Sequence, residues 1–258
     1  MQLAFISPID ALPMTEDQAL HLMLPQLVDE PEYKRHFLKM RRLGKRIILD
    51  NGANEGFEIS DKELAKIAGD FFVDELVLPD VMGDFHATVA RSKDFLNQQR
   101  LNLRREVEFG FVLHGRTYYD AISNFDFLMN SRELYSQISV IYLPRMMVRE
   151  VGDRVRINVA DYIFTQAPKL NKHIHFLGAS PLWMLECKEA SQLAVGPKKR
   201  IRSMDTSAPF VYARAGKYVD EGVYKRNEKT FFHSPLSIDQ RLMARENMDA
   251  MNRWAGAR

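Results

Sequence analysis

Ile201-Arg-Ser-Met-Asp205-Thr-Ser-Ala-Pro209 has the pattern of a short strand that ends on the carboxylate of Asp205 and then turns into a helix. Thr206 or Ser207 would cap that helix, and Pro209 would lie in its first turn, where the missing backbone N–H of a proline is tolerated. The stretch therefore predicts a strand end that presents one acidic side chain.

The same pattern, an apolar run closed by a polar or glycine residue, recurs along the chain. The residues that close these runs are Asp50, Asp80, His114, Arg145, Gly178 and Asp205. Successive closing residues are about 30 positions apart, which is the length of one strand–helix unit. Two earlier apolar runs, 3–7 and 19–24, complete a set of eight predicted strands. The run 19–24 also fits a helix, since a short apolar run does not fix the period.

Predicted strands and helices alternate throughout. The other strands are expected at 46–50, 75–79, 108–113, 138–143, 173–177 and 201–204. The expected helices are 32–43, 60–68, 155–167 and a closing amphipathic helix at 238–254, with one of about 20 residues after the strand 75–79. Alternation predicts a parallel sheet with helices outside. Polar ends on eight strands favour a single (β/α)8 TIM barrel over an open doubly wound sheet, because a barrel gathers all strand ends at one mouth.

Composition and length set broad limits. A chain of 258 residues suits one barrel domain spanning 1–258, with a basic C-terminal region at about 196–258. The net charge of +2 is too mild to predict a nucleic-acid partner by itself. One cysteine, Cys187, excludes an internal disulfide and a cysteine-rich zinc site. Without a signal sequence or a membrane span, we expect a soluble, cytoplasmic protein with no membrane partner.

Asp50 and Asp205 would meet at the mouth of such a barrel. Chemistry at an anomeric carbon needs a carboxylate pair, one member to attack or stabilise positive charge and the other to handle the proton. Each could instead begin a turn or cap a helix, but the position at a barrel strand end favours catalysis. His173 and His175 alternate on one strand. Because no third metal ligand is apparent, we expect them to be structural and expect no metal.

Five short motifs occur in a characteristic order between about positions 3 and 210. They are His21-Leu-Met-Leu-Pro25, Leu49-Asp-Asn-Gly-Ala53, His114-Gly115, Phe176-Leu-Gly-Ala179 and Met204-Asp-Thr-Ser-Ala-Pro209. In that order they resemble the Tyr-His-Leu-x-Leu-x-Pro, Asp-Ser-Gly-Gly, Gln-Gly, Leu-Met-Gly-Val and Phe-Asp-Cys-Val-x-Pro segments of the tRNA-guanine transglycosylase superfamily. His114 departs from that pattern, because it replaces a glutamine of the base pocket.

The resemblance implies base exchange, in which guanine is removed from a nucleotide and a 7-deazaguanine is installed through a covalent sugar–enzyme intermediate. By motif match, Asp205 would be the nucleophile on C1′ and Asp50 the general acid and base. Asp80 would accept hydrogen bonds from the exocyclic amine and the ring N–H of the purine. The other expected substrate-binding residues are His114, Gly115, Arg145 and Gly178. No cofactor is implied.

The absence of a Cys-x-Cys-x-x-Cys zinc site separates this chain from the tRNA-modifying members. Its short form resembles the DNA-guanine transglycosylases of bacteriophages and DNA-modification islands, which shield DNA from restriction. The expected partners are DNA with a flipped or single-stranded guanine nucleotide, and a free 7-deazaguanine base such as preQ0. The expected contacts to flanking phosphates are Lys198, Lys199, Arg200 and Arg202. A phage-encoded protein would act in the host cytoplasm, and a homodimer is left open.

Other functions also fit these residues. The same exchange could act on tRNA, or the Asp50 and Asp205 pair could serve a nucleosidase or glycoside hydrolase with water as acceptor. A barrel without catalytic activity that only binds nucleic acid or a partner protein is the alternative from another class.

Overall fold

Eight parallel strands form one sheet in the part of the chain that the structure, a computed structural model, describes: residues 1–147, 154–166, 172–179, 183–193, 201–220 and 230–256. The strands are β1 (Gln2–Phe5), β2 (Leu20–Met23), β3 (Arg46–Leu49), β4 (Glu75–Val77), β5 (Glu108–Val112), β6 (Val140–Pro144), β7 (His173–Leu177) and β8 (Ile201–Thr206). Their order is β1-β8-β7-β6-β5-β4-β3-β2. The two edges, β1 and β2, lie in contact, so the sheet is nearly closed into a (β/α)8 barrel. The predicted fold class is confirmed, and the ambiguous run 19–24 contains a strand.

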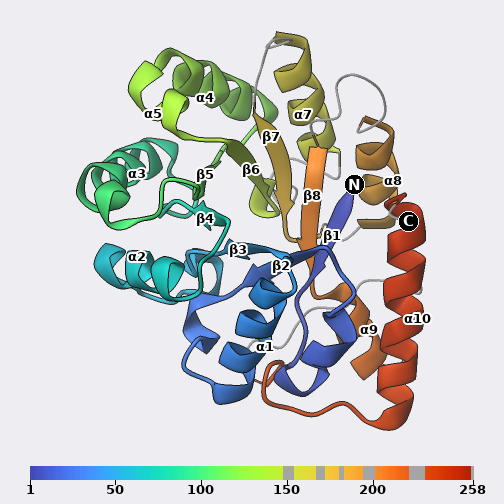
Figure 1. The fold of residues 1–258 in the computed structure, drawn as a ribbon. Helices are drawn as coiled ribbons and strands as arrows, with labels where there is room; N and C mark the ends of the chain where they lie inside the picture. Colours follow the sequence, from blue (N-terminus) through green and yellow to red (C-terminus); the bar gives the residue numbers. More distant parts are fainter. Residues whose placement is uncertain (148–153, 167–171, 180–182, 194–200, 221–229, 257–258) are drawn as a thin grey trace.

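Helices surround this sheet (Figure 1). They are α1 (Pro31–Arg42), α2 (Asp61–Asp70), α3 (Phe85–Gln99), α4 (Tyr118–Asn130), α5 (Arg132–Gln137), α7 (Val155–Gln166), α8 (Trp183–Leu193), α9 (Ala208–Arg214) and α10 (Ile238–Trp254). Short 3-10 turns lie at Ile9–Thr15, Pro25–Leu27, Ala53–Glu55 and Arg100–Asn102. The helix expected to run for about 20 residues after β4 is instead α3 followed by the last of these turns. No helix in the described ranges has the length and apolar character that a membrane crossing requires.

The helix expected after Asp205 is α9, but the side chain at its cap position, Ser207, makes no capping hydrogen bond. Pro209 lies in its first turn, and the Thr206 hydroxyl accepts a hydrogen bond from the Ala208 N–H at 3.0 Å. The closing helix, α10, is capped by Ser237, which precedes it; the side chains of Ser237 and Gln240 each accept from the other's backbone N–H. It packs along α8 and α9 near the first strand (Figure 1). These contacts cover the side of the barrel where the chain begins and ends.

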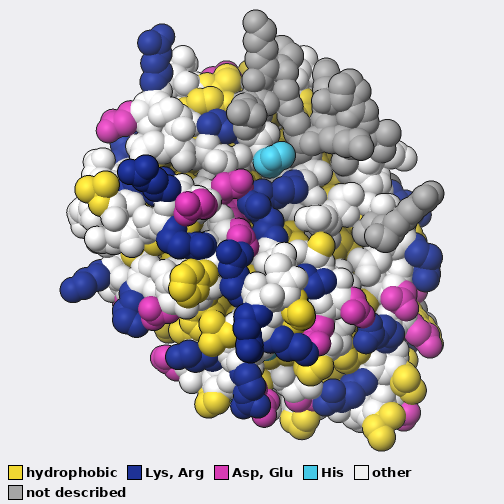
Figure 2. All heavy atoms as spheres, viewed as in Figure 1, with side chains coloured by type: hydrophobic (Ala, Val, Ile, Leu, Met, Phe, Trp, Pro, Cys, Tyr) yellow, Lys and Arg dark blue, Asp and Glu magenta, His cyan; other side chains and the backbone are white. Residues whose placement is uncertain are grey.

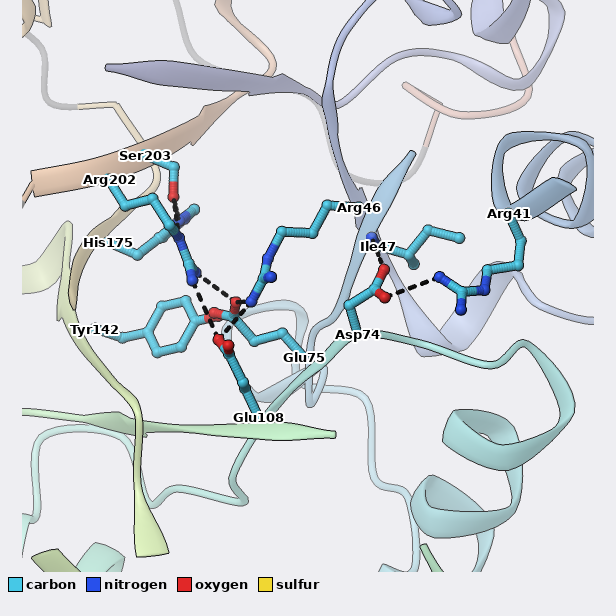
Figure 3. A network of polar contacts seen from close by, with 10 residues as sticks. All are labelled: Arg41, Arg46, Ile47, Asp74, Glu75, Glu108, Tyr142, His175, Arg202 and Ser203. Carbon is cyan, nitrogen blue, oxygen red and sulfur yellow. Dashed lines mark hydrogen bonds and ion pairs between the residues drawn. The ribbon is translucent and has the colours of Figure 1, made fainter. Parts of the chain in front are cut away.

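Charged side chains pair with one another at the end of the barrel where the strands begin (Figure 3). Arg46 donates to Glu75 at 2.9 Å and to Glu108 at 2.5 Å. Arg202 also pairs with both carboxylates, and the Tyr142 hydroxyl donates to Glu75. These five residues are called the floor cluster below. The expectation that Arg202 contacts phosphates beside Asp205 is not supported, because its guanidinium belongs to this cluster.

A β-bulge explains the position of Arg202. Ile174 of β7 pairs with Ile201 of β8, but the next residue, His175, pairs with Ser203. Arg202 is therefore the extra residue on β8. Bulges commonly redirect a side chain in this way. Local sequence does not reveal the bulge, since it depends on how the two strands pair.

Candidate active site

A cavity opens at the carboxyl ends of the strands, and every closing residue predicted from the sequence lines it. These are Asp50, Asp80, His114, Arg145, Gly178 and Asp205, which follow or end β3, β4, β5, β6, β7 and β8. Ile6 and Leu24 line it from the ends of β1 and β2. The predicted convergence of the strand ends at one mouth is therefore observed, as expected for a barrel active site.

The carboxylate of Asp205 is buried and held by two donors. Its Oδ1 accepts a hydrogen bond from the Gly178 N–H at 2.9 Å, and the Nε2 atom of His175 lies 3.1 Å from the same oxygen. Gly178 has a positive φ of 69°, a conformation that favours glycine and turns its N–H toward β8. The predicted substrate contact Gly178 thus lines the cavity while its N–H binds Asp205.

Asp50 lies in the same cavity in a different environment. Its backbone N–H donates to the Met23 carbonyl at 2.9 Å, which extends the β2–β3 pairing to the cavity edge. Burial is the main cause that raises the pKa of its side chain well above the ordinary value, and the nearby carboxylates of Glu55 and Asp205 raise it further. This environment favours the protonated form of Asp50 relative to a carboxyl group in water, while Asp205 accepts two hydrogen bonds. Such a pair can supply an acid and a nucleophile in one cavity.

Asp80 is buried between two neighbouring side chains. The Asn51 amide nitrogen donates to Asp80 Oδ1 at 2.7 Å, and Asn51 is itself oriented because its Oδ1 accepts from the Ala53 N–H at 2.9 Å. His114 Nε2 lies 2.6 Å from Asp80 Oδ2, and the Gly83 N–H donates to His114 Nδ1 at 3.4 Å. His114 thus carries its proton on Nε2 and donates it to Asp80. Each Asp80 oxygen keeps a second acceptor position for a ligand.

The remaining predicted site residues have mixed outcomes. Arg145 lines the cavity, and its backbone N–H donates to the Leu177 carbonyl at 2.9 Å. Gly115 is not among the described lining residues, and a Cβ there would lie 2.7 Å from the Ala121 Cα, so its small size permits α4 to approach β5. That finding argues against its predicted substrate contact. Lys198, Lys199 and Arg200 lie outside the described residues.

Sequence reasoning missed three residues. Asn51 was named only as part of the motif at 49–53, although its amide orients Asp80. Glu55 adds a further carboxylate to the cavity lining. His175 was assigned a structural role because no metal partner was apparent, yet it contacts Asp205. The signal that could have found His175 is its place one strand away from Asp205, but only the strand register shows that the two side chains meet.

Metal binding has no visible basis in the described part of the chain, where no group of three His, Cys, Asp or Glu side chains could hold an ion. Cys187 is buried in α8, and burial raises the pKa of its thiol to about 12, as expected for a packing residue. Comparison of the chain with protein-family models and with curated proteins finds no match. The chemistry of the cavity is therefore inferred from its side chains and from the motifs quoted above.

Proposed function

We propose that this protein exchanges guanine in DNA for a 7-deazaguanine base by double displacement at C1′. The observation that carries the proposal is the pair of buried carboxyl groups in one cavity. Asp205 is held by hydrogen-bond donors, whereas burial and neighbouring acids raise the pKa of Asp50 and so favour its protonated form. A nucleophile and a general acid are the two groups that this reaction needs.

In the first displacement, a carboxylate oxygen of Asp205 forms a bond to C1′ as the bond between C1′ and the guanine nitrogen breaks. Guanine leaves with the bonding electron pair, and protonated Asp50 supplies the proton that the leaving base requires. In the second, Asp50 takes the proton from the corresponding nitrogen of the 7-deazaguanine. That nitrogen attacks C1′ and releases Asp205. Asp50 ends protonated, so each cycle restores the starting state.

Base recognition is assigned to Asp80. Its carboxylate can accept hydrogen bonds from the exocyclic amine and the ring N–H of either base, because a carboxylate has about four acceptor positions and two are already used. Asn51 donates to one oxygen of Asp80 and His114 to the other, and together they fix the plane of the carboxylate. His114 therefore recognises the base through Asp80, which differs from the direct contact that the motif resemblance implies.

A base within a duplex cannot bring its C1′ into the mouth of a barrel, so the target nucleotide must be flipped or single-stranded. Figure 2 shows one face on which the described Lys and Arg side chains are numerous and lie among Asp, Glu and apolar side chains. DNA contacts near the mouth are assigned to the basic C-terminal region. The cytoplasm is the compartment that this substrate implies.

The test is mass spectrometry of nucleosides from plasmid DNA and from tRNA of cells that express the protein and are supplied with preQ0. Asp205→Asn is the key variant. Asp17→Asn is the matched control, because the Asp17 side chain is 88% exposed and far from any proposed role. We expect a 7-deazaguanine deoxynucleoside with the wild type and with Asp17→Asn, and none with Asp205→Asn.

Four results would contradict the proposal in different ways. A modified base in tRNA alone would make the substrate assignment wrong. Free guanine released without an incoming base would indicate a hydrolase. Full activity of Asp205→Asn would exclude Asp205 as the nucleophile. The absence of a modified base from both DNA and tRNA would favour a barrel that only binds nucleic acid or a partner protein.

A further inference from the structure

Three buried side chains form a chain of hydrogen bonds up the interior of the barrel toward the cavity. The Ser203 hydroxyl lies 2.7 Å from His175 Nδ1, and His175 Nε2 lies 3.1 Å from Asp205 Oδ1. Ser203 and His175 have no exposed surface, and Asp205 is 4% exposed. Only Asp205 of the three lines the cavity, among the lining residues described.

The β-bulge between β7 and β8 creates this arrangement. Because the pairing skips Arg202, Ser203 lies directly opposite His175. Asp205 is two residues farther along β8, on the same face of the sheet, where a diagonal neighbour is within reach of a long side chain. The Tyr142 ring packs against the His175 ring with centroids 4.9 Å apart and limits its movement.

The hydrogen-bond partners determine the tautomer of His175. An ionised Asp205 only accepts hydrogen bonds, so Nε2 must carry a proton and donate it. Arg202 Nε donates to the Ser203 oxygen at 3.5 Å, which leaves the Ser203 proton available for His175 Nδ1. The ring nitrogen that faces Asp205 therefore carries a proton.

We propose that His175, oriented by Ser203, is a positioning residue for Asp205 and selects the oxygen that reacts. His175 and the Gly178 N–H both bind Oδ1. Oδ2 is then the oxygen that forms the bond to C1′ while the bond to guanine breaks and its electron pair leaves with the base. His175 keeps its proton throughout. This inference rests on the proposed base exchange and extends it by one residue and one atom.

The test compares two substitutions at the same position. His175→Phe keeps a ring of similar volume but removes the donor to Asp205. His175→Gln retains an amide donor near the position of Nε2. A misplaced reacting group can cost about 100-fold in rate. We therefore expect His175→Phe to lower the single-turnover rate of base exchange by about 100-fold and to leave the Kd for free 7-deazaguanine unchanged. His175→Gln should recover part of the rate.

Ser203→Ala is a milder variant that keeps the inference testable if the ring substitutions unfold the barrel. It should lower the rate by about 10-fold, because the tautomer of His175 is then less firmly fixed. Ser7→Ala is its control. Ser7 is also a buried serine, it is not among the described lining residues, and its loss should leave the rate unchanged.

Nitrogen-15 NMR of the histidine rings tests the geometry without any substrate. A proton on Nε2 of His175 in the wild type supports the inference, and a proton on Nδ1 alone overturns it. An active wild type together with His175→Phe at nearly full rate overturns this inference but leaves the proposed function intact. No exchange by the wild type overturns both.

Discussion

Replacing Glu75 by Gln removes one negative charge from the floor cluster. The Glu75 side chain has no exposed surface, and it accepts hydrogen bonds from Arg46, Arg202 and Tyr142. In the wild type, two guanidinium groups face two carboxylates. In the variant they face Glu108 alone, so a partly buried positive charge is left without compensation.

The expected loss in the free energy of unfolding is about 3 to 5 kcal/mol at pH 7, the range found when one partner of a buried ion pair is removed. Glu108→Gln is the matched control, since Glu108 shares both arginines but its side chain is 36% exposed. Water can replace its charge, so that loss should be about 1 kcal/mol or less.

The pH dependence gives a second measurement of the same effect. Burial alone would raise the pKa of Glu75, but Arg202, Tyr142 and Arg46 together lower it below the ordinary value of 4.5. A lowered pKa contributes stability that is present above 4.5 and is lost as the pH falls through the pKa in the folded protein. The gap between the wild type and Glu75→Gln should therefore be full at pH 7 and shrink in acid.

Urea unfolding followed by circular dichroism, at pH 7 and at decreasing pH values below 4.5, measures both effects. A loss at pH 7 of less than about 1 kcal/mol would refute the reasoning, because it is the size expected for an ion pair in contact with water. Equal losses for Glu75→Gln and Glu108→Gln would refute it as well.

Two further predictions concern packing and titration elsewhere in the fold. Gly110→Ala should lower the Tm by roughly 5 °C or more, because a new Cβ would lie 1.8 Å from the Tyr142 ring; an unchanged Tm in a thermal melt would mean that the ring moves aside without loss. His21 and His36 form a buried pair, and burial is the main cause that lowers their pKa values from 6.5 to about 4. Between pH 6.5 and pH 4 these histidines bind protons in the unfolded chain but not in the folded protein, so the fold loses stability as the pH falls through this range. His36→Phe should make the loss in the free energy of unfolding between pH 6.5 and pH 4 smaller by on the order of 1 to 3 kcal/mol, as measured by urea unfolding at both pH values. An unchanged loss would show that His36 does not titrate in this range.

The sequence predicted the strands and the mouth because both depend on local pattern. Each apolar run is long enough to form one buried strand. Because all strands of a parallel barrel end at the same mouth, the residue that closes each run lies there whichever strands are its neighbours. Asp50, Asp80 and Asp205 therefore lie where the pattern placed them. This part of the prediction needed no knowledge of which strands are neighbours.

What could not be predicted depends on strand register and packing. Arg202 was expected at the mouth because it is close to Asp205 in the chain, but the bulge directs it to the floor cluster. His175 contacts Asp205 only because of the same register shift. Gly115 was expected to contact substrate, whereas the close approach of α4 accounts for it. None of these outcomes can be deduced from residue spacing alone.

The position of the floor cluster also bears on how bases enter and leave the barrel in the proposed reaction. Among the described residues, its side chains pair with one another at the N-terminal ends of the strands, opposite to the cavity at the carboxyl ends. In the proposed reaction, guanine and its replacement occupy the same cavity in turn. Turnover would then follow ping-pong kinetics, with free guanine competing directly against the incoming base.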